Sequence, residues 1–247
     1  MILEVANLAR SFGGVDAVRD VSFSVAAGEM LAMIGPNGAG KTTCFNLVNG
    51  QLAADSGRIE LSGREITRLG SREIGRLGVG RTFQITATFA SMTVRENVQL
   101  ALLSHERRLA DPWTRAGGLC RDAAERLLES VGMLNQADRS CAVLAYGDLK
   151  RVELALALAN EPKLLLMDEP TAGMAAAERR ELMVLVAALA HERSIAVLFT
   201  EHDMDVVFAH AHRILVLHRG RLIAQGAPDE VRANAEVREV YLGAGAT

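Results

Sequence analysis

The stretch GPNGAGKTT, residues 35–43, decides the fold. It fits the pattern G-x-x-x-x-G-K-[ST], with an apolar run before it and a helical pattern, TTCFNLVNG, after it. Glycines let backbone N–H groups curl around phosphate oxygens, and the N-terminus of the following helix attracts negative charge. The sequence therefore predicts a phosphate-binding loop, whose residues are Gly35, Pro36, Asn37, Gly38, Ala39, Gly40, Lys41, Thr42 and Thr43.

Two side chains of this loop have specific roles in the pattern. Lys41 is expected to reach the β- and γ-phosphates of a nucleotide, and the Thr42 hydroxyl is expected to bind Mg²⁺. The alternative is a chance glycine-rich turn. A strand before the loop and a helix after it argue against that alternative, because the phosphate site needs both.

Four apolar runs predict the strands of a central sheet: MLAMI (30–34), LLLM (164–167), IAVLF (195–199) and ILVL (214–217). Runs without alternation are typical of strands that are covered on both faces. Between the second and third runs, a helical pattern places Leu182, Leu185, Val186 and Leu189 on one face. Strands that alternate with helices predict a mostly parallel α/β sheet.

The remaining segments follow different patterns. LEVANLARSF, VRDVSFSV and GRIELSGREI alternate, which predicts an N-terminal antiparallel sheet with one covered face. Residues from about 86 to 160 read as helices inserted between two halves of the sheet, with an exposed loop at 109–120. We expect a single domain over residues 3–243, followed by a short tail at 244–247.

The run LLLMDEP (164–170) ends a buried strand with two acids. Asp168 is expected to bind Mg²⁺ through a water, and Glu169 to polarise an attacking water. On its own, this pair could be a solvated turn at a strand end. Together with the phosphate loop, it predicts a site that hydrolyses a nucleotide.

These motifs and their order resemble those of the ATP-binding cassette (ABC) ATPases, the nucleotide-binding subunits of membrane transporters, over nearly the whole chain. RTFQ (81–84) resembles the family's Q-loop, which implies that Gln84 contacts Mg²⁺ and the attacking water. TEHD (200–203) resembles the switch region, which implies that His202 touches the γ-phosphate, although a histidine after an apolar strand can also be structural. Phe12 stands where the family stacks an aromatic ring on adenine, and Phe23 competes for that role.

The resemblance also implies a fold. We expect a P-loop NTPase core with a mostly parallel sheet, an N-terminal antiparallel β-subdomain and an inserted helical subdomain. The implied ligands are ATP and Mg²⁺.

LAYGD (144–148) stands where the family usually has its signature, LSGGQ. Two cassettes of this family pack head to tail, and each signature faces the ATP held by the other cassette. That implies contact with ATP in trans by Ala145, Tyr146, Gly147 and Asp148. We expect Gly147 to permit close backbone approach and Asp148 to cap the following helix.

The sequence departs from the family twice, at the signature and in the D-loop. In the signature, Ala145 stands where the family has a serine, and Asp148 brings negative charge near a negative ligand. In the D-loop, Ala175 replaces the usual Asp or Asn. We expect ATP binding despite both departures. They keep open whether this chain hydrolyses ATP efficiently or is the poorly hydrolysing partner of a sister cassette.

Three details resemble the branch of the family that serves branched-chain amino acid uptake: MTVRENV after RTFQ, the tyrosine in LAYG, and the tail VYLG (240–243). Related branches carry urea, aromatic acids or lipopolysaccharide. The branch implies transmembrane permease subunits that contact residues of about 85–98. It also implies a second ABC ATPase, identical or different, and indirectly a solute-binding protein.

Composition limits the other classes of function. A net charge of −3 gives no basic field, so we expect no nucleic-acid partner, and a mechanical cassette acting on nucleic acid or ribosomes is disfavoured. The longest apolar run, LMVLVAALA (182–190), is about half of what a membrane span needs. Since we also find no signal peptide, and Cys44, Cys120 and Cys141 suggest no disulfide frame, we expect a cytoplasmic protein. It would bind peripherally to the cytoplasmic face of the membrane through the permease.

Overall fold

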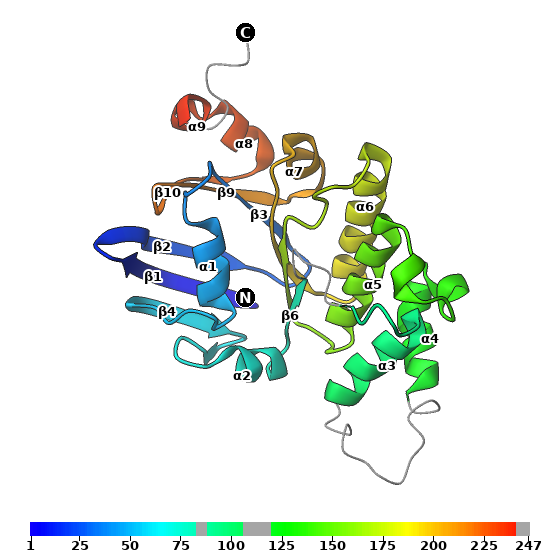
Figure 1. The fold of residues 1–247 in the computed structure, drawn as a ribbon. Helices are drawn as coiled ribbons and strands as arrows, with labels where there is room; N and C mark the ends of the chain where they lie inside the picture. The colour runs from blue at the N-terminus through cyan, green and yellow to red at the C-terminus, as the bar shows by residue number, and fades with distance from the viewer. Residues whose placement is uncertain (83–87, 106–119, 241–247) are drawn as a thin grey trace.

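A computed structural model describes residues 1–82, 88–105 and 120–240 of the 247-residue chain. Two β-sheets and their surrounding helices make up the fold (Figure 1). The strands are β1 (Leu3–Phe12), β2 (Val15–Val25), β3 (Met30–Ile34), β4 (Ser56–Leu61), β5 (Arg64–Glu65), β6 (Val79–Thr82), β7 (Leu164–Asp168), β8 (Ala196–Thr200), β9 (Arg213–His218) and β10 (Arg221–Gly226). The helices are α1 (Lys41–Val48), α2 (Ser71–Arg76), α3 (Val94–His105), α4 (Arg121–Ser130), α5 (Tyr146–Leu158), α6 (Ala176–Glu192), α7 (Met204–His210), α8 (Pro228–Ala233) and α9 (Ala235–Val240), with short 3₁₀ turns η2 (Leu134–Gln136) and η3 (Cys141–Val143).

The larger sheet has the order β10-β9-β3-β8-β7-β6. Its pairs are parallel except for β10, which runs antiparallel to β9. The predicted mostly parallel sheet is therefore confirmed, and each of the four apolar runs forms one of its strands. The sequence reading missed β6 and β10, the two edge strands.

The smaller sheet has the order β2-β1-β4-β5, and all of its pairs are antiparallel. This confirms the predicted N-terminal antiparallel sheet. Leu3, Val5 and Leu8 on β1 are buried, and they belong to the same core as Ile59 and Leu61 on β4. One face of this sheet is thus covered, as the alternating pattern indicated.

The larger sheet separates two hydrophobic cores. Alternate residues of β3 point to opposite sides: Leu31 and Met33 join the core shared with the small sheet and α1, while Met30, Ala32 and Ile34 join the other. The second core also contains residues of α3, α4, α5, α6 and α7. Burial on both faces explains why the strand reads as a continuous apolar run.

Helices α3, α4 and α5 pack together at the end of the molecule opposite the small sheet (Figure 1). All three lie within the range predicted to be helical, although Phe89–Thr93 leads into α3 as an irregular segment held by a bridge between Thr93 and Ser140. Arg95 on α3 ties this segment to its neighbours through Asp138 at 3.2 Å and Glu125 at 3.5 Å. Most of the loop expected at 109–120 lies outside the described residues.

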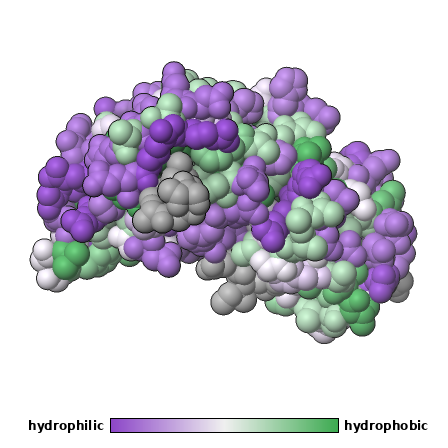
Figure 2. Space-filling view, turned by 90° about the horizontal axis from the view of Figure 1, so that it is seen from above, coloured by the Kyte–Doolittle hydropathy of each residue, from purple (hydrophilic) through white to green (hydrophobic). Residues whose placement is uncertain are grey.

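Within the described part of the chain, no helix combines the length and apolarity needed to cross a membrane. The face shown in Figure 2 is mostly hydrophilic, with apolar residues scattered over it and somewhat denser at one end.

Candidate functional site

The loop between β3 and α1 needs glycine at both of its ends. Gly35 (φ +154°) and Gly40 (φ +106°) adopt backbone angles that other residues rarely reach. A Cβ at Gly35 would lie 2.2 Å from the carbonyl oxygen of Leu217, and one at Gly40 would lie 2.3 Å from that of Ala17. The loop is therefore held tightly against neighbouring backbone, with α1 starting directly after it.

This loop forms one wall of a cavity of about 300 Å³. Two side chains from distant parts of the sequence complete the cavity: Glu169, which follows β7, and His202, which follows β8. Both strands end at the same edge of the sheet as β3, where ligands of parallel sheets bind. The loop and flanking residues that line the cavity are Ala17, Asn37, Gly38, Ala39, Gly40, Lys41, Thr42 and Thr43.

Lys41 is buried at the base of the loop. Its Nζ donates to the carbonyl oxygens of Gly35 at 2.6 Å and Pro36 at 3.2 Å. Burial lowers the pKa of the Lys41 ammonium, and the nearby charges of Glu169 and Asp168 oppose that shift. The loop thus holds a cation within the field of the two acids.

Asp168 and Glu169 are both held by β8. The Thr200 hydroxyl donates to Oδ1 of Asp168 at 2.7 Å, and the backbone N–H of Glu169 donates to the same hydroxyl at 3.1 Å. Arg81 on β6 lies 3.7 Å from the other oxygen of Asp168. These contacts orient Asp168 beside the cavity and fix the backbone of Glu169, whose side chain lines the cavity.

Glu169 and His202 meet directly. Nε2 of His202 lies 2.8 Å from Oε1 of Glu169, and both side chains are partly exposed to the cavity. A carboxylate beside an imidazole can accept and relay a proton or polarise a water molecule. Glu169 and His202, which were predicted from separate motifs, therefore lie in contact in the same cavity.

The sequence reading missed Thr200 and Arg81. Thr200 is fully buried, and it connects the two acids to the strand that leads to His202. A signal was present, because a hydroxyl at the end of a strand parallel to β7 must lie at the same edge of the sheet. Arg81 also contacts Asn46 and Gln51, at 2.9 and 2.8 Å, so it joins β6 to the region after the phosphate loop.

The two candidates for an adenine-stacking ring differ sharply in exposure. Phe23 is 6% exposed and belongs to the core of the small sheet, so its faces are already covered. Phe12 is 43% exposed, and the Arg10 guanidinium lies 4.9 Å from its ring centre. The structure favours Phe12 over Phe23 as the ring available to a ligand. Gln84 lies outside the described residues.

The signature turn does not line the cavity of its own chain. Helix α5 starts at Tyr146 with Ala145 as its N-cap residue, so the expectation that Asp148 caps this helix is wrong. Ala145 already has the extended backbone of a cap residue, which places Asp148 in the first helical turn. In that position the negative charge of Asp148 still interacts favourably with the positive N-terminal end of the helix dipole. Gly147 packs against Glu178, since a Cβ would lie 3.3 Å from its carboxyl carbon.

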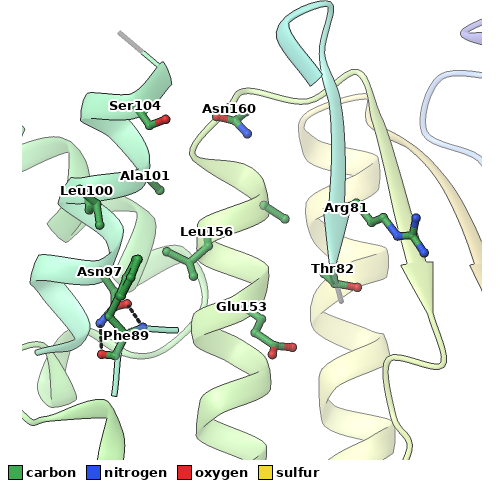
Figure 3. A pocket seen from close by; sticks show the side chains of 11 residues that line it. Arg81, Thr82, Phe89, Asn97, Leu100, Ala101, Ser104, Glu153, Leu156 and Asn160 are labelled. Carbon is green, nitrogen blue, oxygen red and sulfur yellow. Dashed lines mark hydrogen bonds between the residues drawn. The ribbon is translucent and has the colours of Figure 1, made fainter. Parts of the chain in front are cut away.

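A second cavity, of about 430 Å³, lies between β6 and helices α3 and α5. Figure 3 shows Leu100, Ala101 and Ser104 on α3 and Leu156 on α5 around it. Glu153 also lines it, although the residue is only 4% exposed. Oε2 of Glu153 accepts from Lys150 at 3.0 Å, whereas Oε1 has no hydrogen-bond partner among the described residues.

Comparison with known sequences gives two family matches. The model of the family described as ABC transporter matches residues 18–172, and that of the branched-chain amino acid ATP-binding cassette transporter matches residues 221–247. Among curated relatives, the chain is 39% identical to the high-affinity branched-chain amino acid transport ATP-binding protein LivG of Salmonella typhimurium. It is 38% identical to BraF of Pseudomonas aeruginosa, described in the same words. Each alignment covers 98% of both chains.

Solved structures agree with these matches. The chain superposes on the ADP conformation of MJ1267, an ATP-binding cassette of an ABC transporter, with a TM-score of 0.87 and 32% identity, covering 98% of this chain and 99% of the other. A nucleotide-free cassette from an ABC transporter gives a TM-score of 0.86 at 31% identity, with the same coverage. A dimeric cassette bound to ADP and phosphate, MJ0796, shares the fold at 23% identity and a TM-score of 0.76, covering 92% of this chain and 99% of the other.

Proposed function

The chain belongs to the ABC transporter family of ATP-binding subunits, and we propose that it powers the uptake of branched-chain amino acids. Its full-length relatives LivG and BraF are named for that transport, and its C-terminal segment matches the corresponding branch. The observation that supports ATP hydrolysis by this chain is the contact between Glu169 and His202 inside the cavity of the phosphate loop.

The substrate of the site is ATP with its Mg²⁺. Lys41 and the loop amides bind the phosphates, and Phe12 stacks on the adenine. The oxygen donors Thr42 and Asp168, together with Gln84, suit Mg²⁺, which is typically held by one or two carboxylates plus substrate phosphates. The described residues contain no cluster of three or more His, Cys, Asp or Glu that could hold a metal ion by itself. The site thus fits a metal that arrives with the nucleotide.

Hydrolysis then relies on side chains of this chain. Glu169 orients and polarises the attacking water, and His202 stabilises charge on the γ-phosphate. Thr200 holds Asp168 and the backbone of Glu169, so that the base keeps its position when the nucleotide binds.

A second cassette completes the site. Since the signature residues Ala145, Tyr146, Gly147 and Asp148 stand away from their own cavity, they are available to the ATP of a neighbouring cassette. That neighbour is either a second copy or a sister ATPase. The alternative remains a poorly hydrolysing cassette, because Asp148 and Ala175 depart from the usual sequences.

We propose the cavity between β6, α3 and α5 as the docking site for the permease. It adjoins the segment of about 85–98 that receives permease helices in this family. Its apolar wall suits a short amphipathic helix, and the unpartnered oxygen of Glu153 would accept from a donor on that helix. This docking would hold the chain on the cytoplasmic face of the membrane and connect it indirectly to a solute-binding protein.

Uptake of labelled leucine by cells that lack the gene tests the solute. The wild-type gene is expected to restore uptake, and a Glu169→Gln version is expected to fail although the protein is made. Restored uptake of urea or an aromatic acid, with no effect on leucine, would contradict the proposed solute and leave the ATPase assignment intact.

A further inference from the structure

One arginine joins the segment after Glu169 to the segment that carries His202. Arg179 lies in the first turn of α6 and is partly buried. Its Nε donates to the carbonyl oxygen of Met174 at 2.8 Å, and its Nη1 donates to Oδ2 of Asp203. Met174 ends the turn that begins at Glu169, and Asp203 directly follows His202.

Both ends of this bridge are restrained. The turn after Glu169 is closed by backbone hydrogen bonds, from Ala172 to Glu169 and from Met174 to Thr171, each 3.1 Å long. On the other side, Oδ1 of Asp203 accepts from the backbone amides of Asp205 and Val206 in the first turn of α7, and so caps that helix. A shift of Asp203 would therefore move the start of α7 and His202 together.

The contacts form a closed ring. It runs from Glu169 through its turn to Met174, across Arg179 to Asp203, and back through His202, whose Nε2 lies 2.8 Å from Glu169. The guanidinium suits this task, because its planar fork donates in two fixed directions at once, whereas a lysine offers a single point charge.

A separate tie keeps the two segments folded together without Arg179. The buried Glu201 accepts from the Thr171 hydroxyl at 2.6 Å and from the Thr171 backbone at 2.9 Å. This buried pair anchors the two segments independently of the contacts that Arg179 makes.

We infer that Arg179 is a positioning residue for ATP hydrolysis. It holds His202 in register with Glu169 and transmits movements of the turn at 171–175 to the segment after β8. The inference rests on the proposed ATPase function, since it assigns a role within the same site.

Arg179→Met tests this role, with Arg180→Met as the matched control, because Arg180 is the exposed neighbour on the same helix. We expect Arg179→Met to lower kcat about tenfold or more while the KM for ATP stays unchanged, since a small misplacement of a catalytic group slows chemistry more than binding. The control is expected to match the wild type. An unchanged kcat in Arg179→Met would overturn the inference.

A double variant distinguishes positioning from general stability. In a His202→Ala background, Arg179→Met should cause no further loss of kcat, because its effect passes through His202. A further loss as large as in the wild-type background would show that Arg179 acts on the fold instead, and would overturn the inference.

An NMR measurement makes the test independent of turnover. The side-chain signals of His202 are expected to shift in Arg179→Met and in Asp203→Asn, which keeps one oxygen to cap α7, and to stay in place in Arg180→Met. Unmoved signals in Asp203→Asn would contradict the inference even if Arg179→Met fails to fold. Absence of hydrolysis by the wild type, with the signals shifted as expected, would instead count against the proposed ATPase function.

Discussion

At the scale of single residues, the chemistry converges on one edge of the sheet. Three separate sequence motifs place Lys41, Glu169 and His202 around the same cavity. The residue types and their order were readable in the sequence, because each follows an apolar strand. The contact of Thr200 with Asp168 could not be predicted, although its place at a strand end was visible, because it depends on which strand lies beside β7, and strand order is a long-range property.

Glu169→Gln is predicted to abolish hydrolysis and spare binding. The amide keeps the shape of the carboxylate but cannot accept a proton from water, so the rate should fall by about 100-fold or more. Steady-state phosphate release, combined with ATP binding by equilibrium dialysis, checks both parts. Turnover within about twofold of the wild type would show that another group is the base.

Cys44 is predicted to resist thiol reagents in the folded protein. Burial raises the pKa of the Cys44 thiol to about 12, so the reactive thiolate is scarce at pH 8 and appears only on opening of the structure. Mass spectrometry after iodoacetamide treatment should find the half-buried Cys120 labelled first. Labelling of native Cys44 at the rate seen in urea would contradict this burial.

At the scale of elements, prediction followed burial. Strands covered on both faces, such as β3, were predicted from continuous apolar runs. Strands β1 and β2 were predicted from alternating apolar and polar residues. The edge strands β6 and β10 were not predicted. Their sequences, VGRT and RLIAQG, are short or mix apolar and polar residues, and they form strands because they pair with a neighbouring strand. The start of α5 was misplaced because an aspartate suits both a cap and a first turn, so the local sequence could not decide between them.

The contribution of α1 to stability can be measured at Phe45. This ring is fully buried between α1 and the core of the small sheet, so Phe45→Ala should lower the free energy of unfolding by about 3–5 kcal/mol. Urea denaturation followed by circular dichroism measures the change. Val184→Ala, at an exposed position of α6, serves as the control and should shift the midpoint little.

The proposed docking of the permease in the cavity between β6, α3 and α5 can be tested at Leu100. Leu100→Glu places a charge on its apolar wall, which should weaken co-purification of the chain with the permease subunits while ATP binding by the isolated chain persists. Val184→Glu is the matched exposed control. Equal recovery of permease with both variants would show that docking occurs elsewhere.

At the scale of the whole molecule, we propose that the site is completed by a second cassette. The loop that should contact the γ-phosphate from the opposite side begins at Ala145, and none of its residues lines the chain's own cavity. This arrangement supports the proposal that a second cassette supplies the missing contact. The departures at Asp148 and Ala175 make the pairing of this chain a question for measurement.

The most direct test of a shared site is steady-state ATP hydrolysis as a function of protein concentration, with Glu169→Gln as the blank. A rate that rises more steeply than the protein concentration, and is absent in the blank, is the predicted result, because two cassettes must meet to complete each site. A rate strictly proportional to concentration down to the most dilute samples would show that a single chain hydrolyses ATP alone, and would contradict the account.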